Sequence, residues 1–166
     1  FRLIIAVVIV FISQLSFGQL VIDKSLTPEQ LVQQVLIGSG VTVSNVIYTG
    51  KADSALGQFM NGNTTNLGID EGIVLSSGDV DLIPGPANGP NASVNNGEPG
   101  DEDLDELEGV LGTNDASTLE FDFIPQSDTL TFSYVFGSEE YPEFVNQFND
   151  VFAFFITGHN PNGPDY

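Results

Sequence analysis

The chain of 166 residues contains no cysteine and no tryptophan, one histidine, and only three basic residues. Without cysteine it can form neither a disulfide framework nor a thiolate metal site, so a metal would have to bind through oxygen atoms or His159. Its 23 acidic residues give a net charge of −20, which repels nucleic-acid phosphates and anionic lipid headgroups. Both are therefore excluded as partners of this surface.

Phenylalanine, by contrast, is abundant, with 13 copies against a single methionine. This composition favours a core of aromatic and β-branched strands over a bundle of leucine-rich helices. The length suits one domain that buries a sizeable core.

The first 18 residues have the pattern of a secretory signal peptide. Arg2 precedes an apolar run at residues 3–12, and the small residues Ser16 and Gly18 stand before a cleavage point near Gln19. A membrane-spanning helix needs about 20 apolar residues, and this run is too short. We expect residues 1–18 to be removed on export, which leaves a mature chain without membrane insertion.

One helix is predicted near the start of the mature chain. Thr27 is placed as its N-cap, Pro28 as its first residue, Gln30 as the partner in a capping box and Gly38 as its terminator. The buried stripe is predicted to contain Leu31, Val35 and Leu36.

All later regular elements are predicted to be strands, because apolar residues alternate between turns rich in glycine, proline and asparagine. The expected strands are residues 41–50, 72–78, 117–125, 128–137 and 150–158. Their expected inward residues are Val41, Val43 and Ile47 (a face that Asn45 interrupts), Leu119, Phe121 and Phe123, and Leu130, Phe132, Tyr134 and Phe136.

The stretch 150–158 is apolar on both faces, which is typical of a central strand covered on each side. The fold class is therefore all-β, an antiparallel β-sandwich or jelly roll with one N-terminal helix. Residues 84–113 interrupt it as a long acidic loop, and loops of this length are usually functional or disordered.

Several motifs occur in an order that resembles a known family. They are "LTPEQLVQQVLIGSGVTVSNVIYTG", "NLGIDEGIVLSSG", "GDEDL" and "DASTLEFDFIPQSDTLTFSYVFGSEEYPEFVNQFNDVFAFFITG". Together they resemble the choice-of-anchor L domain, which is found in exported bacterial surface or secreted proteins. The resemblance implies a domain over residues 19–166, truncated at its C-terminus, in a polypeptide with further C-terminal domains and a sorting signal such as that of type IX secretion.

The acidic run of the long loop has three aspartates with the spacing of an EF-hand. Glu106 and Gly112, however, replace the glycine at position six and the glutamate at position twelve, so the rest of the motif is absent. Two interpretations stay open: a solvated acidic loop, or ligation of calcium by part of the run. Asp101 and Asp103 are the better ligand candidates because the resemblance centres on "GDEDL".

A second acidic group lies between the last two predicted strands. Glu139 and Glu140 are adjacent in sequence, so in an extended chain they point to opposite faces and cannot form a catalytic pair in one pocket. One of them can meet Asn149 and Asp150 at the same end of the sheet. These side chains face solvent, hold an ion, or do chemistry, and the first two interpretations are favoured.

The sequence thus predicts an oxygen-only calcium site. Its candidate ligands are Asp101, Asp103, Glu139, Glu140, Asn149 and Asp150. Magnesium suits such glycine-rich loops less well because it requires a strict octahedron.

The predicted function is a non-catalytic extracellular module that serves adhesion or display, with an extracellular glycan or protein as its ligand. The alternative is a glycoside hydrolase-like, carbohydrate-active enzyme that would use Glu139 or Glu140 with Asp150. The chain has no nucleophile elbow, HExxH or P-loop, and His159 lies in a tail that would hold a general base poorly.

Overall fold

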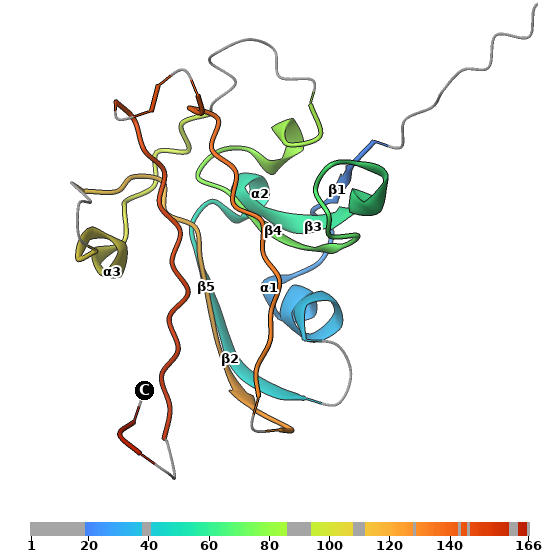
Figure 1. Ribbon diagram of the computed structural model, residues 1–166, viewed down its shortest axis with the longest axis vertical. Coiled ribbons are helices and arrows are strands. Elements are labelled where there is room, and N and C mark those ends of the chain that lie inside the picture. The colour runs from blue at the N-terminus through green and yellow to red at the C-terminus, as the bar shows by residue number, and fades with distance from the viewer. Residues whose placement is uncertain are drawn as a thin grey trace, which may run out of the picture.

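The computed structural model describes residues 19–37, 41–85, 94–107, 112–127, 129–142, 144–145, 147–159 and 163–165. In these residues the regular structure is mainly antiparallel strands with a few short helices, which confirms the all-β class (Figure 1). The predicted signal peptide at 1–18 and the predicted helix terminator Gly38 lie outside the described residues.

The first sheet is antiparallel and has three strands in the order β1 (Val21–Asp23), β3 (Leu56–Met60) and β4 (Gly72–Leu75). β4 lies within the strand predicted at 72–78. Gly72 pairs with Phe59, and a Cβ atom at Gly72 would meet the Phe59 ring at 2.8 Å. The glycine therefore lets the ring lie across the neighbouring strand.

The second sheet pairs β2 (Thr42–Thr49) with β5 (Thr118–Ile124) in antiparallel register. The alternation predicted for β5 is confirmed, because one row of side chains is half-buried and the other is exposed. The half-buried row is Leu119, Phe121 and Phe123, and the exposed row includes Glu120 and Asp122.

A bulge in β2 changes the face predicted for that strand. Asn45 has a left-handed backbone with φ of 52°, and the pairing with β5 shifts between Ser44 and Ile47. Because a bulge moves later side chains to the other face, Val46 and Tyr48 are half-buried while Ile47 is 55% exposed. The prediction that Ile47 faces inward is therefore wrong.

The predicted helix begins with the predicted cap. In α1 (Pro28–Gln30) the Thr27 hydroxyl accepts the Gln30 N–H at 3.3 Å, and the Gln30 side chain accepts the Thr27 N–H at 2.9 Å. The helix then widens into a π-helix, η1 (Leu31–Leu36).

This widening changes the buried stripe. The Ile37 N–H donates to the Val32 carbonyl at 3.1 Å, a bond across five residues that rotates later side chains relative to an α-helix. Leu31 and Val32 are buried and Val35 is half-buried, but Leu36 is 41% exposed. The prediction holds for Leu31 and is wrong for Leu36.

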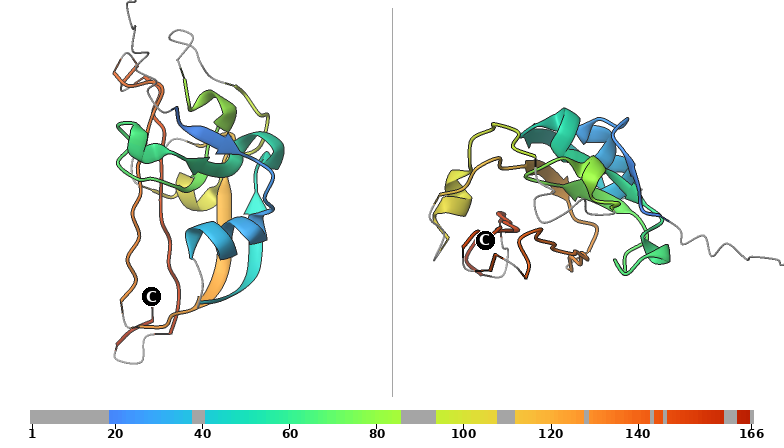
Figure 2. Two further views of the ribbon diagram at one scale, coloured as in Figure 1. Left: turned by 90° about the vertical axis from the view of Figure 1, so that its right-hand side faces the viewer. Right: turned by 90° about the horizontal axis from the view of Figure 1, so that it is seen from above.

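Four further short elements connect these parts: α2 (Ala52–Ala55), η2 (Gly62–Thr64), η3 (Val80–Leu82) and α3 (Glu102–Asp105). The π-helix contacts β3 and β4, so the core forms where the first sheet meets η1 (Figure 2). The buried apolar residues are Leu20, Leu31, Val32, Ala55, Leu56 and Val80.

Beyond β5 the described chain contains no hydrogen-bonded strand, contrary to the predictions for 128–137 and 150–158. Instead, residues 129–137 and 151–158, here called the aromatic segments, run extended and side by side apart from β2 and β5 (Figures 1 and 2). Their rings meet between them, with Phe132 stacked on Phe154 at 4.2 Å and Tyr134 on Phe152 at 5.3 Å between centroids.

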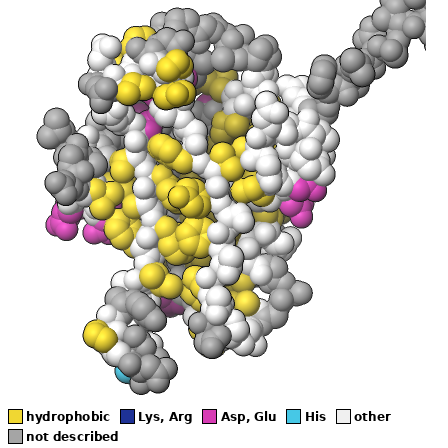
Figure 3. All heavy atoms as spheres, viewed as in Figure 1, with side chains coloured by type: hydrophobic (Ala, Val, Ile, Leu, Met, Phe, Trp, Pro, Cys, Tyr) yellow, Lys and Arg dark blue, Asp and Glu magenta, His cyan; other side chains and the backbone are white. Residues whose placement is uncertain are grey.

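The predicted inward faces of the aromatic segments are exposed. Phe132 is 44% and Tyr134 62% exposed, while Phe154 and Phe155 are 50% and 56% exposed, and Figure 3 shows hydrophobic side chains across this face. Residues 150–158 are thus not a strand covered on each side, because no layer of the described chain lies over them.

Candidate functional site

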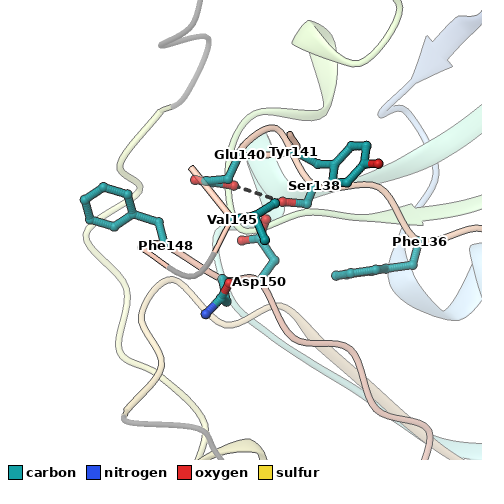
Figure 4. Close-up of a pocket in the computed structure, with 8 residues that line it drawn as sticks. Phe136, Ser138, Glu140, Tyr141, Val145, Phe148 and Asp150 are labelled. Carbon is teal, nitrogen blue, oxygen red and sulfur yellow. Dashed lines mark hydrogen bonds between the residues drawn. The ribbon is translucent and has the colours of Figure 1, made fainter. Parts of the chain in front are cut away.

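A turn at residues 138–149 connects the aromatic segments and forms a pocket. It is closed by backbone hydrogen bonds from Phe144 to Glu140 at 2.8 Å and from Phe148 to Phe144 at 3.1 Å, and its Tyr141–Pro142 peptide bond is cis. The pocket has a volume of about 180 Å³ (Figure 4). Its lining residues are Phe136, Ser138, Glu140, Tyr141, Val145, Phe148, Asn149 and Asp150.

Two carboxyl groups meet in this pocket. The Glu140 carboxyl interacts with that of Asp150, and it accepts a hydrogen bond from the Ser138 hydroxyl at 3.1 Å, which Figure 4 marks with a dashed line. The hydrogen bond with Asp150 raises the pKa of Glu140, burial raises it further, and the Ser138 hydroxyl partly opposes the shift. Glu140 therefore holds its proton more readily than an isolated glutamate does.

The two adjacent glutamates are separated as predicted. Glu140 is half-buried and lines the pocket, whereas Glu139 is exposed and is not part of the lining. Of the six predicted ligands, the pocket brings together Glu140, Asn149 and Asp150.

Asp101 and Asp103 belong to a different part of the molecule, at α3, which lies at the left of Figure 1 below the turn. Asp101 is the N-cap of α3, and its carboxylate accepts the Leu104 N–H at 3.1 Å. Thr113 closes this loop, because its hydroxyl accepts the Asp101 N–H and donates to Asp105, each at 2.8 Å. Asp101 therefore already has a structural task, and neither Asp101 nor Asp103 lines the pocket.

The described residues contain no group of three or more histidine, aspartate and glutamate side chains placed to hold a metal. The pocket offers two carboxyls, with the Ser138 hydroxyl and the Asn149 side chain as further polar groups. A cation there would compete with the proton of Glu140 and take its remaining ligands from backbone carbonyls or water.

The geometry of the carboxyl pair also bears on glycoside hydrolysis. The two carboxyl groups of glycosidases are separated by about 5 to 9.5 Å, which leaves space for a sugar carbon or a water molecule. Glu140 instead interacts directly with Asp150, and this contact does not favour glycoside hydrolysis.

Sequence analysis missed Ser138 as a member of the site. Ser138 and Glu140 are two residues apart, so in an extended chain they point to the same side, and this spacing was the available signal. The aromatic wall of Phe136 and Phe148 carried no local signal, because the turn brings these rings to the pocket from residues twelve apart.

Among the described residues, no helix is both long and apolar enough to cross a membrane. The chain matches the family model of the choice-of-anchor L domain over residues 20–165. Comparisons with curated proteins and with solved structures give no match. The family suggests an exported, surface-associated extracellular module. The match covers most of the sequence, and the chain therefore belongs to the choice-of-anchor L domain family.

Proposed function

We propose that this chain is a non-catalytic extracellular module of a modular bacterial surface or secreted protein, and that it serves adhesion or display. The observation that carries the proposal is the family match over residues 20–165. Export depends on residues 1–18 acting as a signal peptide, with type IX secretion as the proposed route. The ligand is an extracellular glycan or protein.

Charge and surface support this role. A net charge of −20 keeps the chain well hydrated and away from anionic lipid, while the aromatic segments present a large uncharged surface to contact a ligand. We further propose that the complete module is a β-sandwich or jelly roll.

The test of this function is export followed by attachment. Expressed with its own leader in a suitable host, the mature chain should begin within a few residues of Gln19 and bind a glycan or matrix-protein array. An uncleaved chain embedded in the membrane would contradict export. Sugar turnover that Glu140→Gln abolishes would contradict a non-catalytic role.

We also propose that calcium stabilises the turn through Glu140 and Asp150, with Asn149 and the Ser138 hydroxyl nearby. This proposal rests on the two carboxyl groups and two neutral polar side chains around one pocket. Calcium takes six to eight oxygen ligands in flexible geometry, so backbone carbonyls and water would complete the shell. A dication would compete with the proton of Glu140 and remove the repulsion between two ionised carboxylates.

Thermal unfolding of the full-length protein at pH 7.5, in EDTA and in millimolar calcium at constant ionic strength, tests this site. At a hundred times its dissociation constant, calcium should add about 2.7 kcal/mol and raise the melting temperature by several degrees. Asp150→Asn should remove the gain, while Glu120→Gln, an exposed acid on β5, should keep it. Asp103→Asn, measured in the same way, shows whether a residue of α3 contributes to the calcium-dependent gain in melting temperature. Equal melting temperatures of the wild type in calcium and in EDTA would contradict the proposal.

A further inference from the structure

Residues 130–137 and 151–158 of the aromatic segments carry backbone groups without hydrogen-bond partners among the described residues. No backbone hydrogen bond joins residues 130–137 to 151–158 or to β5, and the backbone bonds of this region lie within the turn, such as Phe144 to Glu140. Side chains of an extended chain stand at right angles to its N–H and C=O groups. Because the rings of the two segments point toward each other, their backbone groups face away from the opposite segment and stay open to another strand.

The side chains of the segments are equally open. Rows of apolar residues on both segments are about half exposed, and the rings stack only on each other. Soluble proteins seldom leave a contiguous apolar surface of this kind unless it serves an interaction. The most exposed members are Tyr134, Val135, Phe136, Phe154 and Phe155.

The charges around the aromatic segments indicate which charges a partner that covers them should carry. Residues 129–137 and 151–158 contain no charged side chain, but Glu139, Glu140 and Asp150 stand at the turn that joins them. In Figure 3 acidic side chains lie at the margins of this face, and no described lysine or arginine shows on it. A second copy would bring the same acidic margins and another net charge of −20, so it would be repelled.

We propose that the aromatic segments bind, by strand addition, an extended strand of a partner protein that is apolar along its middle and carries lysine or arginine at its ends. The proposal deepens the adhesive function above and rests on it. Main-chain hydrogen bonds supply the affinity of such a complex, and the rows of apolar side chains supply its specificity. The basic end next to the turn lies against its acidic side chains, and the basic residues speed association at low salt.

The test uses full-length protein and fluorescently labelled synthetic peptides of eight alternating valine, tyrosine and threonine residues, flanked at each end by two lysines. We expect saturable binding by anisotropy, weakened at least tenfold between 50 and 500 mM salt, because screening removes the attraction of exposed charges. A matched peptide with glutamate flanks should bind at least tenfold more weakly. A peptide N-methylated at alternate residues should also lose at least tenfold, because it cannot complete the ladder.

Variants of the protein locate the binding surface. Combined replacement of Phe132 and Phe154 by serine should abolish binding, and replacement of both by tyrosine should restore it. Ile47→Ser is the matched control, because Ile47 is also exposed but lies on β2. Amide hydrogen exchange should slow at residues 130–137 or 151–158 when the peptide is bound, a readout that does not depend on any variant folding.

Equal binding of the lysine- and glutamate-flanked peptides, equal binding of the N-methylated peptide, or no binding of any peptide would overturn the proposal. So would concentration-dependent self-association that protects the same amides, because the occupant would then be a second copy. If no peptide binds while the exported protein still attaches to its array ligand, the inference fails and the proposed adhesive function stands.

Discussion

The first sheet with its π-helix and the aromatic segments are built from similar apolar sequence but differ in burial. In the first region Leu31 and Val32 are almost fully buried, whereas Phe132 and Phe154 remain about half exposed. The difference lies in what is opposite each surface, since η1 packs on β3 and β4 and no described layer covers the aromatic segments. Alternation of apolar residues thus predicts that the chain is extended. Whether those residues are buried in a core depends on a second layer that packs against them.

The largest expected effect compares the two regions directly. Leu31→Ala should lower the free energy of unfolding by about 2 to 5 kcal/mol, because it leaves a cavity in the core. Phe132→Ala should cost less, because the ring is 44% exposed: it loses its stacking on Phe154, worth about 0.5 to 1.5 kcal/mol, and the burial of only part of the ring. Urea unfolding of both variants measures the two values. A larger loss for Phe132→Ala would show that the aromatic segments are part of the core.

Two glycine substitutions test the same comparison, with an expected effect on stability of intermediate size. A Cβ atom at Gly62 would lie 1.9 Å from the Ile69 carbonyl oxygen, whereas one at Gly137 would meet nothing within 4 Å. Gly62→Ala should therefore cost about 1 to 3 kcal/mol through overpacking. Gly137→Ala should be neutral or stabilising by up to about 1 kcal/mol, since it only restricts the unfolded chain.

Thermal denaturation of the two glycine variants beside the wild type checks this pair. A melting temperature of Gly137→Ala that falls as far as that of Gly62→Ala would show close packing at the end of the first aromatic segment, and the contrast between the regions would disappear there.

The smallest expected effect concerns pH and the carboxyl pair. Because the pKa of Glu140 is raised in the folded protein, its contribution to stability is present below the ordinary value of 4.5 and is lost as pH rises through the raised value. Glu140→Gln keeps a hydrogen-bond donor for Asp150 and does not titrate. In calcium-free buffer the wild type should therefore lose stability relative to this variant as pH rises from 4.5 through the raised pKa of Glu140. A difference that does not change with pH would contradict the raised pKa of Glu140.

Local signals predicted the elements that local chemistry determines. The capping box of Thr27 and Gln30 and the alternation of Phe121 and Phe123 were both readable, because each involves neighbours along the chain. The Asn45 bulge and the π-helix change which residues face inward. The sequence pattern did not specify which residues would change face. The first strand of the three-stranded sheet and β3 were missed because short strands carry too few alternations.

The candidate site was readable in part for similar reasons. The opposite directions of Glu139 and Glu140 follow from the geometry of an extended chain, and the approach of Glu140 to Asp150 follows from a short turn between two antiparallel segments. The separation of Asp101 from this pocket was not readable, because the position of α3 depends on how the long loop packs. Thr113 fixes that loop by bonds across twelve and eight residues.

Residues 130–137 and 151–158, whose backbone groups have no partner among the described residues, also affect how proteases cleave the protein. Proteases bind their substrates as extended chain, and loop or terminal segments with open backbone are cut first. Trypsin has no site beyond Lys51, because the rest of the sequence contains neither lysine nor arginine. Chymotrypsin-like enzymes instead find accessible tyrosine and phenylalanine at Tyr134 and Phe155. The aromatic segments thus resist one class of secreted protease and are susceptible to another, and a ligand bound to the segments would protect them.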